Sequence, residues 1–554
     1  MKITVADALL KELERAGVDT IFGIISIHNL PIYDALQRHG GFRVITARHE
    51  AAIVNMADAF SRVSGKLGVA LTSTGTGAGN AAGAIIEAWN GGGSVLHVTG
   101  QVASTYLDTG RGFIHDCKDQ LSLLKSISKE AYRLRRPEQA PAFFRRAIRE
   151  ATSPPPGPVS IELPIDFQAF LIEPPTFVMP SSELQVPSDQ DLIPAIDRML
   201  QAERPVIWAG SGAMLSDSSA EVTELMKLLD AAVVTTQSAR GIVPETDSRS
   251  IGHFATFPAL QSFIAKADLL ISIGVRFRGN ETSNWNMTTP VEHIGIDIDA
   301  AAINRNFQHS FGIVGEAKAT LAALIRLLRA RQPKPKAGYR EEVAELQRAL
   351  RGKVRDTLGP WEGILDAIQE YMPADAILVR DVTVPATTWG SRLVMRRFPR
   401  TTLHASAGGI GQGLPMAIGA QIAAPEKTVV LLCGDGGLLL NIGELAAVRQ
   451  EQIPLVTILF DDAGYGILRN IQNAHFDGRT IGVDLESPDF VAIARAFGFG
   501  ADRVRSVEEF RKAFQQAIKS RQPWMVVVDS NAIGPMKEIF SGFDSGGKIF
   551  KPHS

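Results

Sequence analysis

Short apolar runs recur along almost the whole chain, and stretches with helical periodicity lie between them. The run Leu455–Phe460 has almost no polar side chains, whereas Ala51–Ser64 repeats its apolar residues with the 3.6-residue period of a helix. A strand that is apolar on both faces is typical of a parallel sheet covered by helices on both sides. The sequence therefore predicts an α/β fold made of doubly wound, mostly parallel sheets.

The chain length and two proline-containing segments divide this pattern into three units. A chain of 554 residues corresponds to about three domains of ~150 residues each. The proline-rich stretches 154–158 and 174–180 with the polar run 181–191 mark one boundary, and the basic, proline-containing run RARQPKPK at 329–336 is typical of a second linker. The expected strands are 20–25, 42–47, 67–72, 94–99 and 159–163, then 205–209, 232–235, 269–273 and 293–298, then 428–433 and 455–460. The predicted domains are 1–180, 190–330 and 358–535, followed by a glycine-rich tail at 536–554.

Composition excludes several classes of protein. Hydrophobic residues make up 45% of the chain and charged residues 21%, which is typical of a well-packed globular protein. A net charge of −2 gives no electrostatic basis for binding nucleic acid, and no apolar run is long enough to span a membrane. Cys117 and Cys433 form no spacing motif, and Met1–Gly17 is expected to be an amphipathic helix, not a signal peptide. We expect a cytoplasmic, soluble protein.

Acidic and glycine residues follow two strands of the third unit. The expected strand Thr428–Cys433 ends in Gly434-Asp435-Gly436, and Leu455–Phe460 ends in Asp461-Asp462. Because parallel strands end at the same edge of a sheet, both acidic groups should lie side by side, where open α/β sheets bind ligands. Carboxylate oxygens with free backbone amides suit Mg²⁺ and a diphosphate. Ordinary acidic turns after strands would give the same residues.

The spacing of these residues favours the first interpretation. Gly-Asp-Gly, the 24 residues 437–460 and then an Asp-Asp pair closely resemble the thiamine diphosphate (ThDP) signature, in which Asn-Asn ends the motif. The resemblance implies that Asp435, Asp462 and the carbonyl of Gly464 hold Mg²⁺. The Asp pair departs from the family pattern and adds a negative charge near a diphosphate.

Resemblance to ThDP enzymes extends from Val5 to Asp529. It is densest in FGIISIHNLPIYDAL, ARHEAAIVNMADAFSR, LTSTGTGAGN, GGIGQGLPMAIGAQ and the segment from Leu431 to Gly466. The order of these motifs is similar to acetohydroxyacid (acetolactate) synthase, benzaldehyde lyase and benzoylformate decarboxylase. It implies a pyrimidine-binding domain, a central domain and a diphosphate-binding domain, which in the family pair in a homodimer or homotetramer.

Glu50 is the main candidate catalytic residue. It follows Arg48-His49 at a strand end, where a glutamate could simply stabilise a helix N-terminus. By resemblance, this glutamate hydrogen-bonds N1′ of the aminopyrimidine and moves the proton that activates the cofactor. The same resemblance places Ile410 beneath the cofactor. The other implied cofactor-binding residues are Gly75, Asn80, Asp381, Thr383, Gly408, Gly434, Asp435, Gly436, Asp462, Gly464, Tyr465 and Gly466.

Two histidines are candidates for controlling the choice of substrate. His28 lies where benzaldehyde lyase also has histidine, and His115 matches an active-site glutamine of that enzyme. Neutral imidazole can relay protons to a substrate oxygen, although either residue could be an ordinary loop histidine. Ile25 and Ser26 replace a proline and a glycine that relatives often have. The pocket therefore differs from that of a standard biosynthetic synthase.

The central unit has weaker signals. The run from Trp208 to Gly212 follows a strand but is not a G-x-G-x-x-G motif. Gly274, Arg276 and Asp297 match positions near the FAD of acetohydroxyacid synthase, and other relatives bind ADP or nothing there. The sequence leaves FAD or ADP open.

The functional hypothesis is ThDP-dependent cleavage or formation of a C–C bond beside the carbonyl of a small 2-oxo acid, with an aldehyde or ketone as acceptor. Alternatives are benzoylformate-type decarboxylation, hydrolysis of a 1,2-diketone and a non-catalytic paralogue. Retention of Glu50 argues against the last of these.

Overall fold

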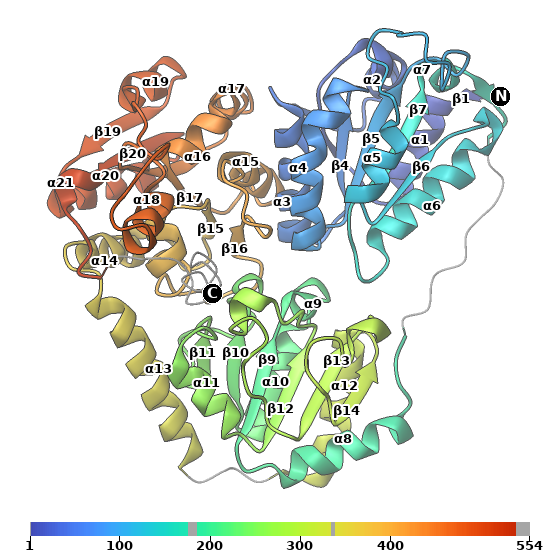
Figure 1. Cartoon of the computed structure of the whole chain (residues 1–554). Helices are drawn as coiled ribbons and strands as arrows, with labels where there is room; N and C mark the ends of the chain where they lie inside the picture. The colour runs from blue at the N-terminus through green and yellow to red at the C-terminus, as the bar shows by residue number, and fades with distance from the viewer. Residues whose placement is uncertain (1, 175–184, 334–337, 539–554) are drawn as a thin grey trace.

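The computed structural model describes residues 2–174, 185–333 and 338–538, and contains three six-stranded parallel sheets. Figure 1 shows the N-terminal unit (blue to cyan) beside the C-terminal unit (orange to red), with the central unit (green) below both. Helices flank each sheet. The predicted fold class is confirmed.

The N-terminal sheet has the strand order β3-β2-β4-β5-β7-β6. Its strands are β2 (Thr20–Gly23), β3 (Arg43–Thr46), β4 (Gly68–Thr72), β5 (Val95–Gln101), β6 (Glu130–Arg133) and β7 (Val159–Pro164). Its helices are α1 (Val5–Arg15), α2 (Leu30–His39), α3 (Glu50–Ser64), α4 (Thr76–Gly91), α5 (Gln120–Ile127), α6 (Ala140–Thr152) and α7 (Ile165–Gln168). A separate antiparallel pair joins β1 (Ile3–Thr4) to β8 (Leu171–Ile172).

The central sheet has the order β11-β10-β9-β12-β13-β14. Its strands are β9 (Pro205–Ala209), β10 (Ala232–Thr235), β11 (Ser250–Gly252), β12 (Leu269–Ile273), β13 (His293–Asp297) and β14 (Phe311–Val314). Its helices are α8 (Asp189–Gln201), α9 (Ser211–Leu215), α10 (Ser219–Leu229), α11 (Pro258–Ala265) and α12 (Ala317–Arg331). Helix α13 (Tyr339–Asp356) then runs from the central unit to the third unit (Figure 1).

The C-terminal sheet has the order β16-β15-β17-β18-β20-β19. Its strands are β15 (Ile377–Arg380), β16 (Thr402–His404), β17 (Val429–Gly434), β18 (Val456–Asp461), β19 (Gly500–Val504) and β20 (Trp524–Asp529). Its helices are α14 (Trp361–Tyr371), α15 (Gly413–Ala423), α16 (Asp435–Leu440), α17 (Leu445–Gln450), α18 (Gly466–His475), α19 (Phe490–Ala496), α20 (Val507–Ser520) and α21 (Ser530–Ile533).

Strand order locates one ligand-binding crevice in each unit. In the first and third units the order reverses between β2 and β4 and between β15 and β17, and in the central unit it reverses between β9 and β12. Ligands of doubly wound sheets bind at such reversals, beyond the carboxyl ends of the strands. All the site residues predicted from the sequence follow strands of these three sheets.

Helices α3 and α15 join the first and third units through a close contact. A Cβ atom at Gly419 of α15 would lie 2.1 Å from the carbonyl oxygen of Met56 in α3, so only glycine allows this approach. Asn55 donates a side-chain hydrogen bond to Gln412 across the same contact. Apolar residues of both units form one continuous buried cluster here.

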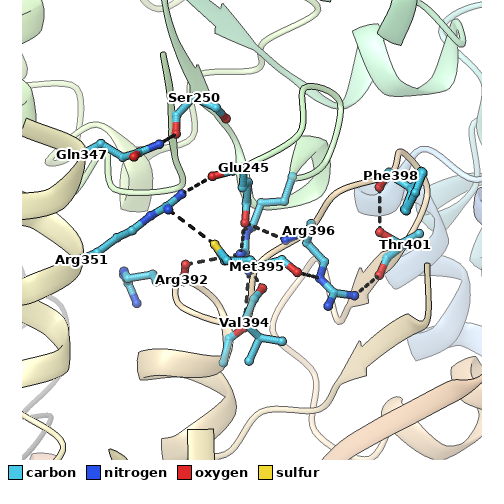
Figure 2. A network of polar contacts seen from close by, with 12 residues as sticks. Glu245, Ser250, Gln347, Arg351, Arg392, Val394, Met395, Arg396, Phe398 and Thr401 are labelled. Atoms are coloured by element: carbon cyan, nitrogen blue, oxygen red, sulfur yellow. Dashed lines mark hydrogen bonds and ion pairs between the residues drawn. The ribbon is translucent and has the colours of Figure 1, made fainter. Parts of the chain in front are cut away.

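A buried polar network joins the central unit to the third unit (Figure 2). Glu245 accepts hydrogen bonds from Arg240 Nε at 2.7 Å and from the backbone N–H of Arg396 at 2.9 Å. Arg351 of α13 donates to the carbonyl oxygen of Glu245 at 2.8 Å. Because buried ion pairs with satisfied hydrogen bonds tolerate little displacement, this network fixes the two units relative to each other.

Several details differ from the prediction. The first helix begins at Val5, not Met1, because Ile3 and Thr4 pair with the distant strand β8. The expected linker at 329–336 is wrong at its start, since α12 continues to Arg331. Strands β6, β11, β14, β16, β19 and β20 and the long helix α13 were not predicted. The domain boundaries stay predictions, and most of the proposed tail lies outside the described residues. Among the described residues, no helix is both long and apolar enough to cross a membrane.

Candidate active site

Asp435 and Asp462 lie together at the carboxyl edge of the third sheet, as predicted. Strands β17 and β18 are paired, with Gly434 opposite Phe460, so the two acidic turns leave the sheet side by side. The carboxylate of Asp435 is buried and accepts hydrogen bonds from the backbone N–H of Gly464 at 2.9 Å and from Ser487 Oγ at 3.0 Å. The two turns therefore form one structural unit.

The charge at this edge fits a divalent cation. Burial and the neighbouring Asp435 carboxylate raise the pKa of Asp462 to about 7. The nearest cation is the Arg469 guanidinium, 3.8 Å from Asp462 Oδ2. Two carboxylates that each disfavour the charge of the other are stabilised by a metal ion between them. In the described part of the chain no three His, Cys, Asp or Glu side chains gather as a metal cage, so main-chain and ligand oxygens would complete the coordination.

The other member of the acidic pair, Asp461, is paired elsewhere, although its charge still helps to raise the pKa values of Asp435 and Asp462. Asp461 is the last residue of β18, and its carboxylate accepts a hydrogen bond from Arg503 Nη2 at 2.9 Å. The charge of Asp461 is therefore paired with Arg503 within the fold, and the negative charge added near Asp435 is that of Asp462.

Asp381, at the end of β15, organises the remaining predicted residues of the third unit. Its carboxylate accepts hydrogen bonds from the backbone N–H groups of Val382, Gly411 and Gly413 at 2.7, 3.1 and 2.9 Å. Burial raises its pKa to about 6. These bonds hold the loop of Gly408 and Ile410 beside the Gly-Asp-Gly turn.

Three close contacts complete the diphosphate side. A Cβ atom at Gly434 would lie 3.2 Å from Thr383 Oγ1, and one at Gly436 would lie 2.6 Å from the ring of Tyr465. Gly466 adjoins Asp462, because a Cβ atom there would meet Asp462 Oδ2 at 2.0 Å. The structure thus brings together all the predicted diphosphate-side and metal-ligating residues.

Glu50 begins α3, following the edge strand β3, and its carboxylate lies at the start of α4. Asn80 Nδ2 donates to Glu50 Oε2 at 3.0 Å, and a Cβ atom at Gly77 would lie 3.0 Å from Glu50 Oε1. The side chain is half-buried. A carboxyl group held by one amide in a partly open position can exchange a proton with a bound ligand.

His28 and His115 are also brought together, near Gly75. Their rings pack edge to face with centroids 5.2 Å apart. His28 is buried, its Nδ1 has no hydrogen-bond partner, and burial with the neighbouring His115 lowers its pKa. A Cβ atom at Gly75 would lie 2.2 Å from the carbonyl oxygen of His115, so glycine permits the contact. The environment of His28 therefore favours its neutral imidazole form.

These residues form two separate groups. Glu50, Gly75, Asn80, His28 and His115 belong to the first unit, and the diphosphate-side residues belong to the third. Within the described ranges, no hydrogen bond or ion pair joins the two groups in one chain. Each group is half of the predicted site.

A cavity of about 880 Å³ lies between the central and third units. Arg276, Arg278, Arg380 and Arg392 line it, together with Gly408. Glycines bring its central-unit walls together, since a Cβ atom at Gly212 would lie 2.7 Å from Gly274 Cα. Several arginines with few opposing carboxylates favour an anionic ligand.

Comparison with known proteins assigns the family. Models of the thiamine pyrophosphate enzyme family match three parts of the chain: the N-terminal binding domain at 3–123, the central domain at 192–324 and the C-terminal binding domain at 385–528. A probable acetolactate synthase large subunit of Methanocaldococcus jannaschii is 32% identical, over 96% of this chain and 93% of its own length. The chain belongs to the thiamine pyrophosphate enzyme family.

Other relatives show the breadth of the family. A probable 2-ketoarginine decarboxylase of Pseudomonas aeruginosa is 32% identical over 92% of this chain and 91% of its own length. The ThDP-dependent 4-hydroxybenzoylformate decarboxylase of Rhodococcus jostii shares the fold, with a TM-score of 0.82 and 23% identity over 97% of this chain and all of its own. The predicted family resemblance is confirmed.

Sequence reasoning missed four residues that support the site. They are Glu87, Glu444, Ser487 and Arg503. Each acts on a residue far away in the sequence, and none lies in a recognisable motif, so no local signal could have found it.

Proposed function

We propose that this chain is an acetolactate synthase-like ThDP enzyme that decarboxylates a small 2-oxo acid such as pyruvate and joins the remaining fragment to an aldehyde or ketone. The observation that carries this proposal is the pair of half-sites, one with Glu50 beside Asn80 and one with Asp435 beside Asp462. Acetolactate synthases that match nearly the whole chain support it.

Each half-site has its own role. Asp435, Asp462 and the carbonyl of Gly464 would hold Mg²⁺ and through it the diphosphate, and Ile410 would support the cofactor from below. Glu50 would donate a proton to the pyrimidine N1′ and take it back. When bound, ThDP supplies an electron sink for cleavage of the bond next to the carbonyl.

The two half-sites require a second copy of the chain. Because no polar contact joins them within the described part of one chain, we infer that the first unit of one subunit meets the third unit of another. Exposed apolar side chains flank both halves, namely Ile27 and Ile114 on one and Leu440 and Leu468 on the other. Such surfaces are typical of subunit interfaces. A homodimer or homotetramer is expected, and an active monomer in light scattering would contradict it.

His28 and His115 would direct the outcome of the reaction. An imidazole kept neutral by burial can hydrogen-bond the hydroxyl group formed when the donor fragment attacks an acceptor. His28→Ala should therefore reduce ligated product more than it reduces CO₂ release. Equal losses would assign His28 to an earlier step.

The arginine-lined cavity would take the FAD or ADP that some relatives bind. Its volume of about 880 Å³ and its position from Arg276 to Gly408 suit a diphosphate-containing nucleotide that extends toward the ThDP site. Flavin absorbance of the purified protein, or calorimetry with ADP, tests this assignment. The cytoplasmic location stays a prediction that cell fractionation can test.

The deciding experiment measures products. Enzyme with ThDP and Mg²⁺ is incubated with pyruvate and then with benzoylformate, each with and without an aldehyde acceptor, and CO₂, free aldehyde and ligated product are counted. Ligated product from pyruvate is expected. Rapid release of aldehyde from benzoylformate, without ligation from pyruvate, would favour the decarboxylase alternative, for which the fold match to a 4-hydroxybenzoylformate decarboxylase is the motivation.

A further inference from the structure

Two buried carboxylates cross the contact between the first and third units in opposite directions. Glu444 of the third unit accepts hydrogen bonds from the backbone N–H groups of Arg48 and His49 in the first, at 2.9 and 3.0 Å. Glu87 of the first unit accepts hydrogen bonds from the backbone N–H groups of Ala407 and Gly409 in the third, both at 2.7 Å. Each carboxylate holds the residue directly before a predicted active-site residue.

Glu444 supplies what the chain before Glu50 lacks. Strand β3 is at the edge of its sheet, and its pairing with β2 ends at Thr46. The N–H groups that follow have no strand partner, and those at a helix start have no helical partner. Glu444 is 1% exposed and accepts both hydrogen bonds through the same oxygen, Oε1. Glu444 thereby gives an acceptor to two N–H groups at the N-terminus of α3 that would otherwise be unpaired.

A second contact strengthens this connection. The guanidinium group of Arg48 donates to Gln450 Oε1 at 2.9 Å, and a Cβ atom at Gly443 would lie 3.7 Å from the Cβ atom of Arg48. The segment 443–450 of the third unit therefore holds the backbone before Glu50, while Asn80 holds the Glu50 carboxylate.

Glu87 has the corresponding role for Ile410. Glu87 is buried, and a Cβ atom at Gly409 would lie 2.8 Å from Glu87 Oε1, so a side chain there would displace the Glu87 carboxylate. On the other side of Ile410, Asp381 accepts the hydrogen bond of Gly411. The loop is thus held between one carboxylate from each unit.

We propose that Glu444 and Glu87 are positioning residues, each supplied by one unit to place a cofactor-contacting residue of the other: Glu444 places Glu50, and Glu87 places Ile410. This inference rests on the proposed function of that site. A displacement of about 1 Å at a catalytic group costs roughly 100-fold in rate, so removal of either acceptor should act on the chemistry even where binding persists.

Replacement by glutamine should affect the two residues differently, because their carboxylates accept the hydrogen bonds in different ways. In Glu444→Gln, the amide oxygen in place of Oε1 still accepts both hydrogen bonds. In Glu87→Gln, one of the two accepting oxygens becomes an amide nitrogen, because Ala407 donates to Oε2 and Gly409 to Oε1. Glu444→Gln should therefore behave like wild type, and Glu87→Gln should not.

The experiment measures exchange of the C2 proton of bound ThDP by NMR after acid quench, together with the ThDP dissociation constant and the melting temperature, for the full-length enzyme with Mg²⁺. We expect Glu444→Ala to exchange about 10- to 100-fold more slowly while binding ThDP within about threefold of wild type. Glu444→Gln should exchange within about threefold of wild type. Glu87→Gln should give lower turnover with the 2-oxo acid than Glu444→Gln.

The outcomes separate the proposals. Two results with Glu444→Ala would overturn the positioning role and leave the proposed function intact. One is a rate of C2-proton exchange equal to that of the wild-type enzyme, and the other is a loss of ThDP affinity as large as the loss of exchange rate. Absence of exchange in the wild-type enzyme overturns both. If Glu444→Ala does not fold, the comparison of the two glutamine variants decides, and equal turnover in both refutes the inference.

Discussion

The ion pair between Arg503 and Asp461 should be essential for the stability of the third unit. The two side chains are 26% and 8% exposed, with 2.9 Å between nitrogen and oxygen. Removing one partner of a buried pair costs about 3–5 kcal/mol, because a charge is left buried without compensation. Arg503 is partly exposed and water can reach the gap, so Arg503→Ala should cost about 2–3 kcal/mol.

A double-mutant cycle isolates this effect. Asp461→Asn should cost about 1 kcal/mol or less, because the amide oxygen still accepts a hydrogen bond. The double variant Asp461→Asn with Arg503→Ala should be more stable than Arg503→Ala alone, since it no longer buries an unpaired charge. For a unit of this size, 2–3 kcal/mol lowers the melting temperature by about 4–12 °C.

The same variants test the relation to the cofactor site. The Asp461 carboxylate already contributes to raising the pKa values of Asp435 and Asp462. Without Arg503 this effect should increase, so Arg503→Ala should need more Mg²⁺ for half-saturation with ThDP, and the double variant should reverse the change. A melting temperature within 1 °C of wild type for Arg503→Ala, with unchanged Mg²⁺ dependence, would refute the reasoning.

Three further predictions concern single carboxylates. Glu50→Gln should bind ThDP but lose turnover by about 10²- to 10⁴-fold, because only proton transfer is removed, and wild-type C2–H exchange in this variant would contradict the assignment. Asp462→Asn should keep activity and bind ThDP more tightly at low Mg²⁺, as measured by fluorescence titration. A metal-ligand role for Asp462 would be excluded if Asp462→Asn lost ThDP binding while Asp462→Ala bound ThDP normally. Burial raises the pKa of Glu444 from 4.5 to about 7, so between those pH values the folded state keeps a proton that the unfolded state has lost. The stability of the wild-type protein should therefore fall as the pH rises through this window, and the melting temperature of Glu444→Gln should fall less. Melting temperatures that fall equally with pH in both proteins would contradict this.

The parts of the fold that sequence reasoning recovered are those with strong local signals. Buried strands such as β12 and β18 are apolar on both faces and end in glycine or acidic residues, so both their existence and their place in a parallel sheet could be predicted. The amphipathic pattern of α3 placed its start within one residue. Edge strands such as β6 and β14 are short and half-exposed, so their pattern does not differ from that of a loop.

The candidate site was recovered to the extent that it depends on strand ends. Asp435, Asp462 and Asp381 each follow a central strand, and strand pairing alone brings them together. Glu444 and Arg48 are 396 residues apart, and Arg503 and Asp461 are 42 apart. Such contacts depend on how whole units pack, which no local pattern of one sequence contains.

The departure from the Asn-Asn signature is explained by two arginines. The sequence suggested that an additional negative charge would face the diphosphate. In the structure, the charge of Asp461 is paired with Arg503, away from the metal-side turn. Arg469 lies 3.8 Å from Asp462 Oδ2 and also donates to the carbonyl oxygen of Ala463 at 3.0 Å, so a positive charge lies beneath the loop that contains the second carboxylate. Arg469 is also paired with Asp484, with 3.0 Å between Nε and Oδ1, so it offsets the charge of Asp462 only in part. Compared with a site that has asparagine at this position, the metal would therefore have one more anionic oxygen available here, and Mg²⁺ itself would offset most of the added charge of Asp462.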